Sequence, residues 1–216
     1  MNYNKSATEE KVTLLLCYRK DKYRKNMQEI YRPLMQQIQE LIQEKKQVIL
    51  SIDGRCGSGK SSLAEAIGNT YDCNIMHMDD FYLPMIKRQE NWWEIPGGNM
   101  DFERIQKEIT EPLLMQEKIL YRPYNCREDF FQQTSVMLPK QLNILEGSYS
   151  QHPRIHIPYS LKIFLTCSAA EQARRLQERE GDHYESFVHR WIPMEELYYR
   201  TFGIDQAKDT RMIDTE

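Results

Sequence analysis

The sequence predicts an α/β fold built on a doubly wound parallel sheet. Short apolar runs typical of buried strands alternate with segments whose composition favours helices. Such alternation implies a parallel sheet that is covered on both faces. The polar motifs follow the ends of the apolar runs, and ligands of these sheets bind beyond the carboxyl ends of the strands. We therefore expect a ligand-binding domain to occupy most of the 216 residues.

The composition narrows the class of protein. Hydrophobic residues make up 40% and charged residues 28% of the chain, which allows a packed core under a well-solvated surface. The net charge of −3 gives no overall attraction to nucleic acid or to an anionic membrane. No apolar run approaches the roughly 18 residues of a membrane span, and no targeting segment is visible, so a cytoplasmic protein is expected. The five cysteines include no C-x-x-C pair, which predicts reduced thiols.

Residues 1–30 are predicted to form an N-terminal extension, ahead of one domain over residues 31–216. The extension contains a short candidate strand at Val12–Cys17 and a basic, tyrosine-rich stretch at 18–25. That stretch is either a solvated surface or a weak nucleic-acid contact, and the acidic chain favours the first. A helix is predicted from Pro33, because apolar residues recur at spacings of three and four from residue 30 to residue 42.

The first strand and helix of the domain flank a glycine-rich segment. Gln47–Asp53 is a short apolar run with β-branched residues, which predicts a buried strand, and Lys60–Gly68 predicts a helix. The later elements continue the alternation. They are expected strands at Cys73–Met78, Gln141–Glu146, Leu161–Thr166 and Arg211–Asp214, expected helices at residues 101–117 and from the capping box Ser168–Glu171 to about Glu180, and a loop or lid at residues 85–101.

The glycine-rich segment Gly54–Ser61 matches the phosphate-binding pattern G-x-x-x-x-G-K-[ST] in full. Glycines allow backbone conformations in which successive N–H groups point at phosphate oxygens, and the following helix adds its positive N-terminal end. Lys60 is expected to reach the β- and γ-phosphates of ATP, and the Ser61 hydroxyl to ligate Mg²⁺. The expected nucleotide contacts are Gly54, Arg55, Cys56, Gly57, Ser58, Gly59, Lys60, Ser61 and Ser62. A chance match would rarely fall between a strand and a helix, so the segment predicts nucleotide binding.

Acidic residues at the ends of two other strands bear on the reaction. Glu146 ends an apolar run and is expected beside the phosphate loop, where it would hold Mg²⁺ or its water shell. Asp79 and Asp80 follow the second strand, where an aspartate can orient an attacking hydroxyl and accept its proton. Asp79 is also an expected metal contact. The alternatives are a solvated strand end for Glu146 and turn chemistry for the aspartates.

Four segments, GRCGSGKSSLA, MDDFYLP, YRPYNC and ILEGSYS, resemble in this order the uridine kinase and phosphoribulokinase group of P-loop kinases. The resemblance is closer to the bacterial uridine kinase-like proteins and covers roughly residues 45–205. It implies a P-loop kinase fold with a helical lid, in which Asp79 is the catalytic base, Tyr82 lies near the acceptor and Glu146 contacts magnesium. It also implies ATP as the donor and the 5′-hydroxyl of a nucleoside as the acceptor.

The resemblance places the acceptor contacts within residues 82–130. Asp101 would hold ribose hydroxyls and Tyr124 would stack on a base. Arg127, a further candidate substrate contact, stands near the position at which these kinases carry a histidine. Trp92 and Trp93 either line the acceptor pocket or have a buried or interface role.

The lid is expected at residues 168–195, where such kinases place arginines that close over the triphosphate. Arg175 is assigned the catalytic role and Arg179 a nucleotide contact, while Arg174 and Arg190 are further candidates. The alternative is a solvated helix face on which the arginines pair with neighbouring glutamates.

Three functions remain open from the sequence. The first is a nucleoside kinase that uses ATP and Mg²⁺, and the second is a kinase for a nucleotide, a sugar phosphate or a pantothenate-like metabolite. A phosphorylated acceptor would need extra basic groups, which Arg88, Arg104 and Arg127 could supply. The third is an ATP-binding switch or assembly protein, which has no need of a base such as Asp79. The expected partner is a small molecule, not nucleic acid or a membrane, and a homo-oligomer is left open.

Overall fold

The computed structural model describes residues 29–216, and the features expected at Val12–Cys17 and 18–25 lie outside this range. The chain divides into two compact units, residues 1–40 and 41–216. Residues 29–44 are helical, so the predicted start of this helix at Pro33 is wrong. The apolar spacing, which begins at Ile30, marks the helix better than the proline does. The predicted domain boundary at residue 30 stays a prediction.

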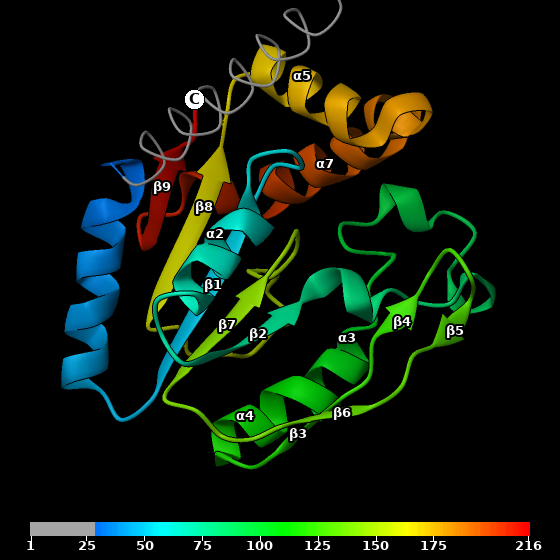
Figure 1. The fold of residues 1–216 in the computed structure, drawn as a ribbon. Helices are drawn as coiled ribbons and strands as arrows, with labels where there is room; N and C mark the ends of the chain where they lie inside the picture. Colours follow the sequence, from blue (N-terminus) through cyan, green and yellow to red (C-terminus); the bar gives the residue numbers. More distant parts are fainter. Residues whose placement is uncertain (1–28) are drawn as a thin grey trace, which may run out of the picture. The chain divides into compact units, whose positions relative to one another are not determined.

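A five-stranded parallel sheet forms the centre of residues 41–216, with its strands in the order β2-β7-β1-β8-β9 (Figure 1). The strands are β2 (Cys73–His77), β7 (Leu142–Glu146), β1 (Val48–Gly54), β8 (Leu161–Thr166) and β9 (Thr210–Asp214). Every residue of β1 and β7 is buried, as expected for strands covered on both faces. The predicted strands of the domain are confirmed to within one residue at each end.

Helices pack on this sheet as the doubly wound fold requires. α2 (Lys60–Gly68) spans its predicted residues and packs on β1, β2 and β7. From α7 (Ile192–Phe202), Tyr199 meets Phe164 of β8 edge-on, with ring centroids 4.9 Å apart. The helix predicted at residues 101–117 is a continuous helical run. It consists of α3 (Phe102–Arg104), a π-helical segment (Ile105–Thr110) and α4 (Glu111–Met115).

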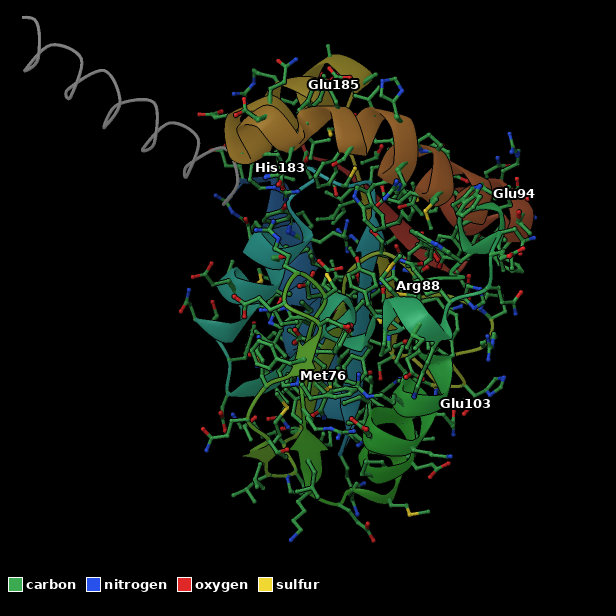
Figure 2. All side chains as sticks on the ribbon, turned by 90° about the vertical axis from the view of Figure 1, so that its right-hand side faces the viewer. Met76, Arg88, Glu94, Glu103, His183 and Glu185 are labelled. Atoms are coloured by element: carbon green, nitrogen blue, oxygen red, sulfur yellow. The ribbon has the colours of Figure 1, made fainter. Side chains whose placement is uncertain are left out.

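The lid begins with α5 (Ala169–Glu180), which starts at the predicted cap because Ser168 Oγ accepts a hydrogen bond from Glu171 N. Short helical segments connect α5 to α7. They are η5 (Gly181–His183), α6 (Tyr184–Ser186) and the π-helical η6 (Phe187–Trp191). Figure 2 labels His183 and Glu185 on these segments, and Arg88 on the loop after Tyr82. No helix within residues 29–216 is both long and apolar enough to cross a membrane.

Two small antiparallel ribbons were not predicted. β3 (Ile119–Tyr121) pairs with β6 (Ser135–Met137), and β4 (Tyr124–Asn125) pairs with β5 (Phe130–Phe131). The strands are too short, and in part too exposed, to produce a readable alternation of apolar and polar residues. The expected loop at residues 85–101 contains two 3₁₀ turns, Met85–Lys87 and Trp92–Glu94. Further 3₁₀ turns are η1 (Met78–Phe81), which follows β2, and η7 (Ile204–Gln206), which precedes β9.

Candidate active site

The segment Gly54–Ser61 forms the turn between β1 and α2. Gly54, at φ 135°, passes so close to β8 that a Cβ there would lie 2.1 Å from Leu165 O. Gly59, at φ 95°, precedes the first residue of α2 and has open space where a Cβ would be. A side chain is excluded by the lack of room at Gly54 and is strained by the backbone conformation at Gly59. The turn is therefore a glycine-dependent cradle of the kind that binds anions.

A cavity of about 870 Å³ opens beside this loop, within the range of small-molecule sites. The expected nucleotide contacts that line it are Cys56, Gly57, Gly59, Lys60, Ser61, Ser62 and Arg179. The other three, Gly54, Arg55 and Ser58, are not part of its lining. Arg55 turns to α7, where its Nε donates to Glu196 over 2.7 Å, and a terminal nitrogen lies 3.4 Å from Asp205. Arg55 is thus held in an ion-pair network outside the cavity lining, and its contact with a nucleotide stays a prediction.

The Lys60 side chain lies along the loop. Its Nζ donates to Gly54 O over 2.6 Å and to Arg55 O over 3.1 Å, and the residue lines the cavity. These carbonyls hold the ammonium group beside the N-terminus of α2. An ammonium group at this place is suited to charge-assisted hydrogen bonds with phosphate oxygens.

Two side chains with oxygen atoms that could coordinate Mg²⁺ meet at the edge of the sheet. The Ser61 hydroxyl donates to Glu146 Oε1 over 3.1 Å, and Glu146 is almost fully buried at the end of β7. His77 of β2 contacts the same carboxylate, and this contact raises the pKa of the imidazole. No group of three or more His, Cys, Asp or Glu side chains within residues 29–216 forms a metal site by itself. The donor set nevertheless fits Mg²⁺, which proteins bind with few ligands together with substrate phosphates.

The two adjacent aspartates of the turn after β2 have different partners. Asp79 Oδ1 accepts a hydrogen bond of 2.7 Å from the Tyr82 hydroxyl. Asp80 accepts one from the Tyr121 hydroxyl, and burial raises the pKa of the Asp80 carboxyl. Burial and the neighbouring Asp79 carboxylate also raise the pKa of the Tyr82 phenol well above its ordinary value, so this phenol stays a donor. Asp79, Asp80 and Tyr82 all line the large cavity.

The predicted acceptor residues divide between two cavities. Tyr124 and Arg127 line the large cavity together with Asn125 of β4 and with Cys126 and Gln132, which directly follow β4 and β5. Asp101 lines a separate cavity of about 500 Å³, and its carboxylate caps α3 by accepting the backbone N–H of Arg104 over 3.1 Å. Sequence spacing could not separate these positions, because Tyr124 and Arg127 lie in a ribbon that was not predicted, whereas Asp101 precedes the helical run before it.

The lid arginines lie in three different environments. Arg174 is exposed and pairs with Glu171 and Glu178, which is the solvated-face alternative. Arg175 is largely buried and donates to Gly57 O and to Thr215 O, away from the cavity lining. Arg179 lines the cavity, and its side chain is 57% exposed and donates to Glu180 over 2.6 Å.

Several residues that line the cavity were missed from the sequence, and Glu195 and Trp191 are the best defined of them. Glu195 of α7 is almost fully buried, lines the cavity, and accepts hydrogen bonds from Cys56 N over 2.9 Å and from the Ser148 hydroxyl. Trp191 lines the same cavity, and its ring centroid lies 6.2 Å from that of Tyr82. Neither residue belongs to a recognisable motif, since both lie in a lid whose path depends on tertiary packing.

Comparisons with solved structures agree with the fold. No family model and no curated protein matches the chain. The structure of a possible uridine kinase from Bacillus stearothermophilus is similar, with a TM-score of 0.67 and 20% identity over 87% of this chain and 99% of that one. YFH7 from Saccharomyces cerevisiae, described as a candidate P-loop containing kinase with a circular permutation, has a TM-score of 0.59 and 12% identity over 87% and 98%. The chain has the fold of the P-loop kinases. At these identities the likeness extends to the fold, which confirms the predicted fold class.

Proposed function

We propose that the protein is an ATP-dependent kinase that transfers the γ-phosphoryl group to a hydroxyl of a small molecule, namely the 5′-hydroxyl of a nucleoside. One observation carries this proposal: the cavity that contains the phosphate loop is also lined by Asp79, which is hydrogen-bonded to Tyr82. A carboxylate at this place has a task in a kinase, because an attacking hydroxyl must be oriented and must lose a proton. A nucleotide switch has no such requirement.

On the donor side, the backbone of Gly57 and Gly59 and the Lys60 ammonium group would bind the phosphates. Ser61 and Glu146 would hold Mg²⁺ through their oxygens, which lie 3.1 Å apart. When bound, Mg-ATP supplies the γ-phosphoryl group, and the ion neutralises charge on its oxygens. Arg179 would bring a further cation to the same cavity.

On the acceptor side, Asp79 would orient the hydroxyl and accept its proton. The Tyr82 hydroxyl donates to one carboxylate oxygen and so fixes the orientation of the carboxyl group. Catalysis would come mainly from this positioning and from stabilisation of charge, since phosphoryl transfer asks for little covalent chemistry from the protein.

The aromatic lining favours a nucleoside over a sugar phosphate or a pantothenate-like acceptor. The rings of Tyr82, Tyr124 and Trp191 line one cavity and offer surfaces on which a planar base can stack. Arg127 lines the same region and could donate to a base carbonyl. Because Asp101 lines a different cavity, acceptor binding is assigned to Tyr82, Tyr124 and Arg127.

The test is a coupled ADP-release assay with Mg-ATP and a panel of nucleosides, nucleotides and pantothenate, run on wild type and on Asp79→Asn. We expect one nucleoside to raise ADP release. Asp79→Asn should lower that increment by about 10²-fold or more, the usual contribution of a general base, while ADP still binds. If no acceptor raises ADP release above the background in wild type or in Asp79→Asn, the result would favour the ATP-binding switch. Stimulation by a nucleotide alone would keep the kinase and replace the acceptor.

A further inference from the structure

We propose that Gln172, Arg175 and Thr215 are positioning residues that orient the peptide groups of the phosphate loop for nucleotide binding. None of the three lines the cavity formed by the described residues. They act on the loop from the outside, through its carbonyl groups. The inference rests on the proposed function only in requiring that the loop binds a nucleotide.

Each of the three side chains donates to one of three successive carbonyls. Gln172 Nε2 donates to Cys56 O over 2.9 Å, and Arg175 donates to Gly57 O over 3.2 Å. The Thr215 hydroxyl lies 3.0 Å from Ser58 O, and its single proton is shared between this oxygen and Thr166 O at 3.1 Å.

These donors are held in place by burial. Gln172 is 7% exposed, Thr215 is 2% exposed, and the Arg175 side chain is 13% exposed. Arg175 also donates to Glu171 over 2.7 Å and to the hydroxyl and carbonyl oxygens of Thr215 over 2.9 and 2.6 Å. One guanidinium group therefore ties the first half of α5 and the residue after β9 to the loop.

The orientation of a carbonyl sets the orientation of the next N–H group. In a trans peptide the C=O and the N–H point to opposite sides, so a carbonyl held outward leaves the following N–H turned inward. The Cys56 and Ser58 carbonyls are held in this way, and the N–H groups that follow belong to Gly57 and Gly59, which line the cavity. Ser58 lies between these two glycines, and its N–H donates to Arg55 O over 3.0 Å, which closes the turn.

Glycine peptides need such external support more than others. Gly57 and Gly59 have φ of 77° and 95°, and a glycine backbone exchanges easily between conformations. A loop whose N–H groups are already turned toward the phosphates binds with less ordering cost than a loop that must rearrange. Removal of an outer donor should therefore weaken nucleotide binding in a protein that is still folded.

The neighbouring Arg174 provides a matched control on the same helix. It bonds to the same Glu171, but its side chain is 58% exposed and its recorded partners are Glu171 and Glu178. Arg174→Ala and Arg175→Ala each remove one arginine partner of Glu171, and only the second removes a donor to the loop. Thr215→Val and Thr215→Ser form a second matched pair, because serine keeps the hydroxyl and valine loses it at nearly constant shape.

The experiment measures the Kd of Mg-ADP by titration calorimetry, and the Tm, for wild type and the variants. We expect Thr215→Val and Gln172→Met to raise the Kd about two- to tenfold, the effect of one hydrogen bond, and Arg175→Ala to raise it about tenfold or more. Arg174→Ala and Thr215→Ser should stay within about twofold of wild type.

Two results would overturn the proposal. If the loop-facing variants lower the Tm but bind Mg-ADP as tightly as wild type, the three residues only stabilise the fold. A wild-type protein that does not bind Mg-ADP would refute this inference and nucleotide binding together. If Arg175→Ala does not fold, the Thr215 pair and Gln172→Met decide.

Discussion

We expect the buried carboxyl group of Asp53 to make the free energy of unfolding fall as the pH rises from about 4 to about 6. Asp53 is the residue before the phosphate loop and has no exposed surface. It accepts hydrogen bonds from Gly54 N over 2.7 Å, from Gln151 N over 3.1 Å and from the Tyr198 hydroxyl over 2.8 Å. Burial raises the pKa of this carboxyl from 3.8 to about 6, while the donors and Lys60 act in the opposite direction.

The sign follows from proton binding in the two states. Between pH 3.8 and about 6 the folded protein holds a proton on Asp53 that the unfolded chain has released, so raising the pH destabilises the folded state. Below this window Asp53 is neutral in both states and carries no cost. Above about pH 6 the carboxyl group is ionised in both states, so the loss in free energy of unfolding stays constant. A difference of about two pKa units corresponds to roughly 3 kcal/mol.

The assay is urea unfolding of wild type and Asp53→Asn at intervals from pH 4 to pH 7.5, with the exposed Asp72→Asn as the control. The difference between wild type and Asp53→Asn removes the contributions of other acids, including Glu171, whose ion pairs with Arg174 and Arg175 lower its pKa to about 2. Relative to Asp53→Asn, wild type should lose about 3 kcal/mol across this range, and Asp72→Asn, which keeps Asp53, should show the same loss.

A difference that stays flat, or that grows in favour of wild type with rising pH, would refute the reasoning. It would mean that the three hydrogen bonds and Lys60 outweigh burial, so that the carboxyl group is ionised in the folded protein throughout. A ¹³C NMR titration of the Asp53 carboxyl provides an independent reading, with an expected midpoint of about 6. This reading does not depend on whether Asp53→Asn folds.

Three further predictions concern the loop and the site. Gly54→Ala should lower the free energy of unfolding by at least about 3 kcal/mol in urea, because its Cβ would lie 2.1 Å from a carbonyl oxygen of β8; a wild-type stability would contradict this. Tyr82→Phe should lower kcat about tenfold without changing the Kd of Mg-ADP, because Asp79 loses a donor; an unchanged kcat would remove Tyr82 from the mechanism. Arg179→Ala should lower kcat about 10²-fold and Arg174→Ala less than twofold, and equal effects would contradict the assignment of Arg179 to the cavity.

The sheet and its phosphate loop could be predicted because their signals are local. A central parallel strand must be apolar on both faces, so Val48–Gly54 and Leu142–Glu146 stand out as short apolar runs. The loop Gly54–Ser61 stands out because its glycines meet a backbone requirement that other residues cannot. The placement of Glu146 beside Ser61 followed from the parallel topology, which brings the carboxyl ends of neighbouring strands to one edge.

The acceptor site could not be predicted to the same depth, because its residues come together only through tertiary packing. Tyr124 and Arg127 reach the cavity on a ribbon whose paired strands contain two residues each. Asp101 has the residue type expected for a ribose contact, but its carboxylate caps a helix. Glu195 belongs to the amphipathic pattern of α7, and only the packing of α7 on Cys56 shows that it meets the loop.

Helical geometry explains why three nearby arginines have three environments. Arg175 and Arg179 are four residues apart and share a face of α5, whereas Arg174 is rotated away from that face and pairs with Glu171 and Glu178. Along the shared face, the N-terminal half of the helix meets the phosphate loop, where Arg175 donates to Gly57 O, and the last turn meets the cavity, where Arg179 lies. Because one helix carries both residues, the distance between the loop and the lid cation is set by a rigid element. A change in the position of α5 would therefore move the support of the loop carbonyls and the lid arginine together.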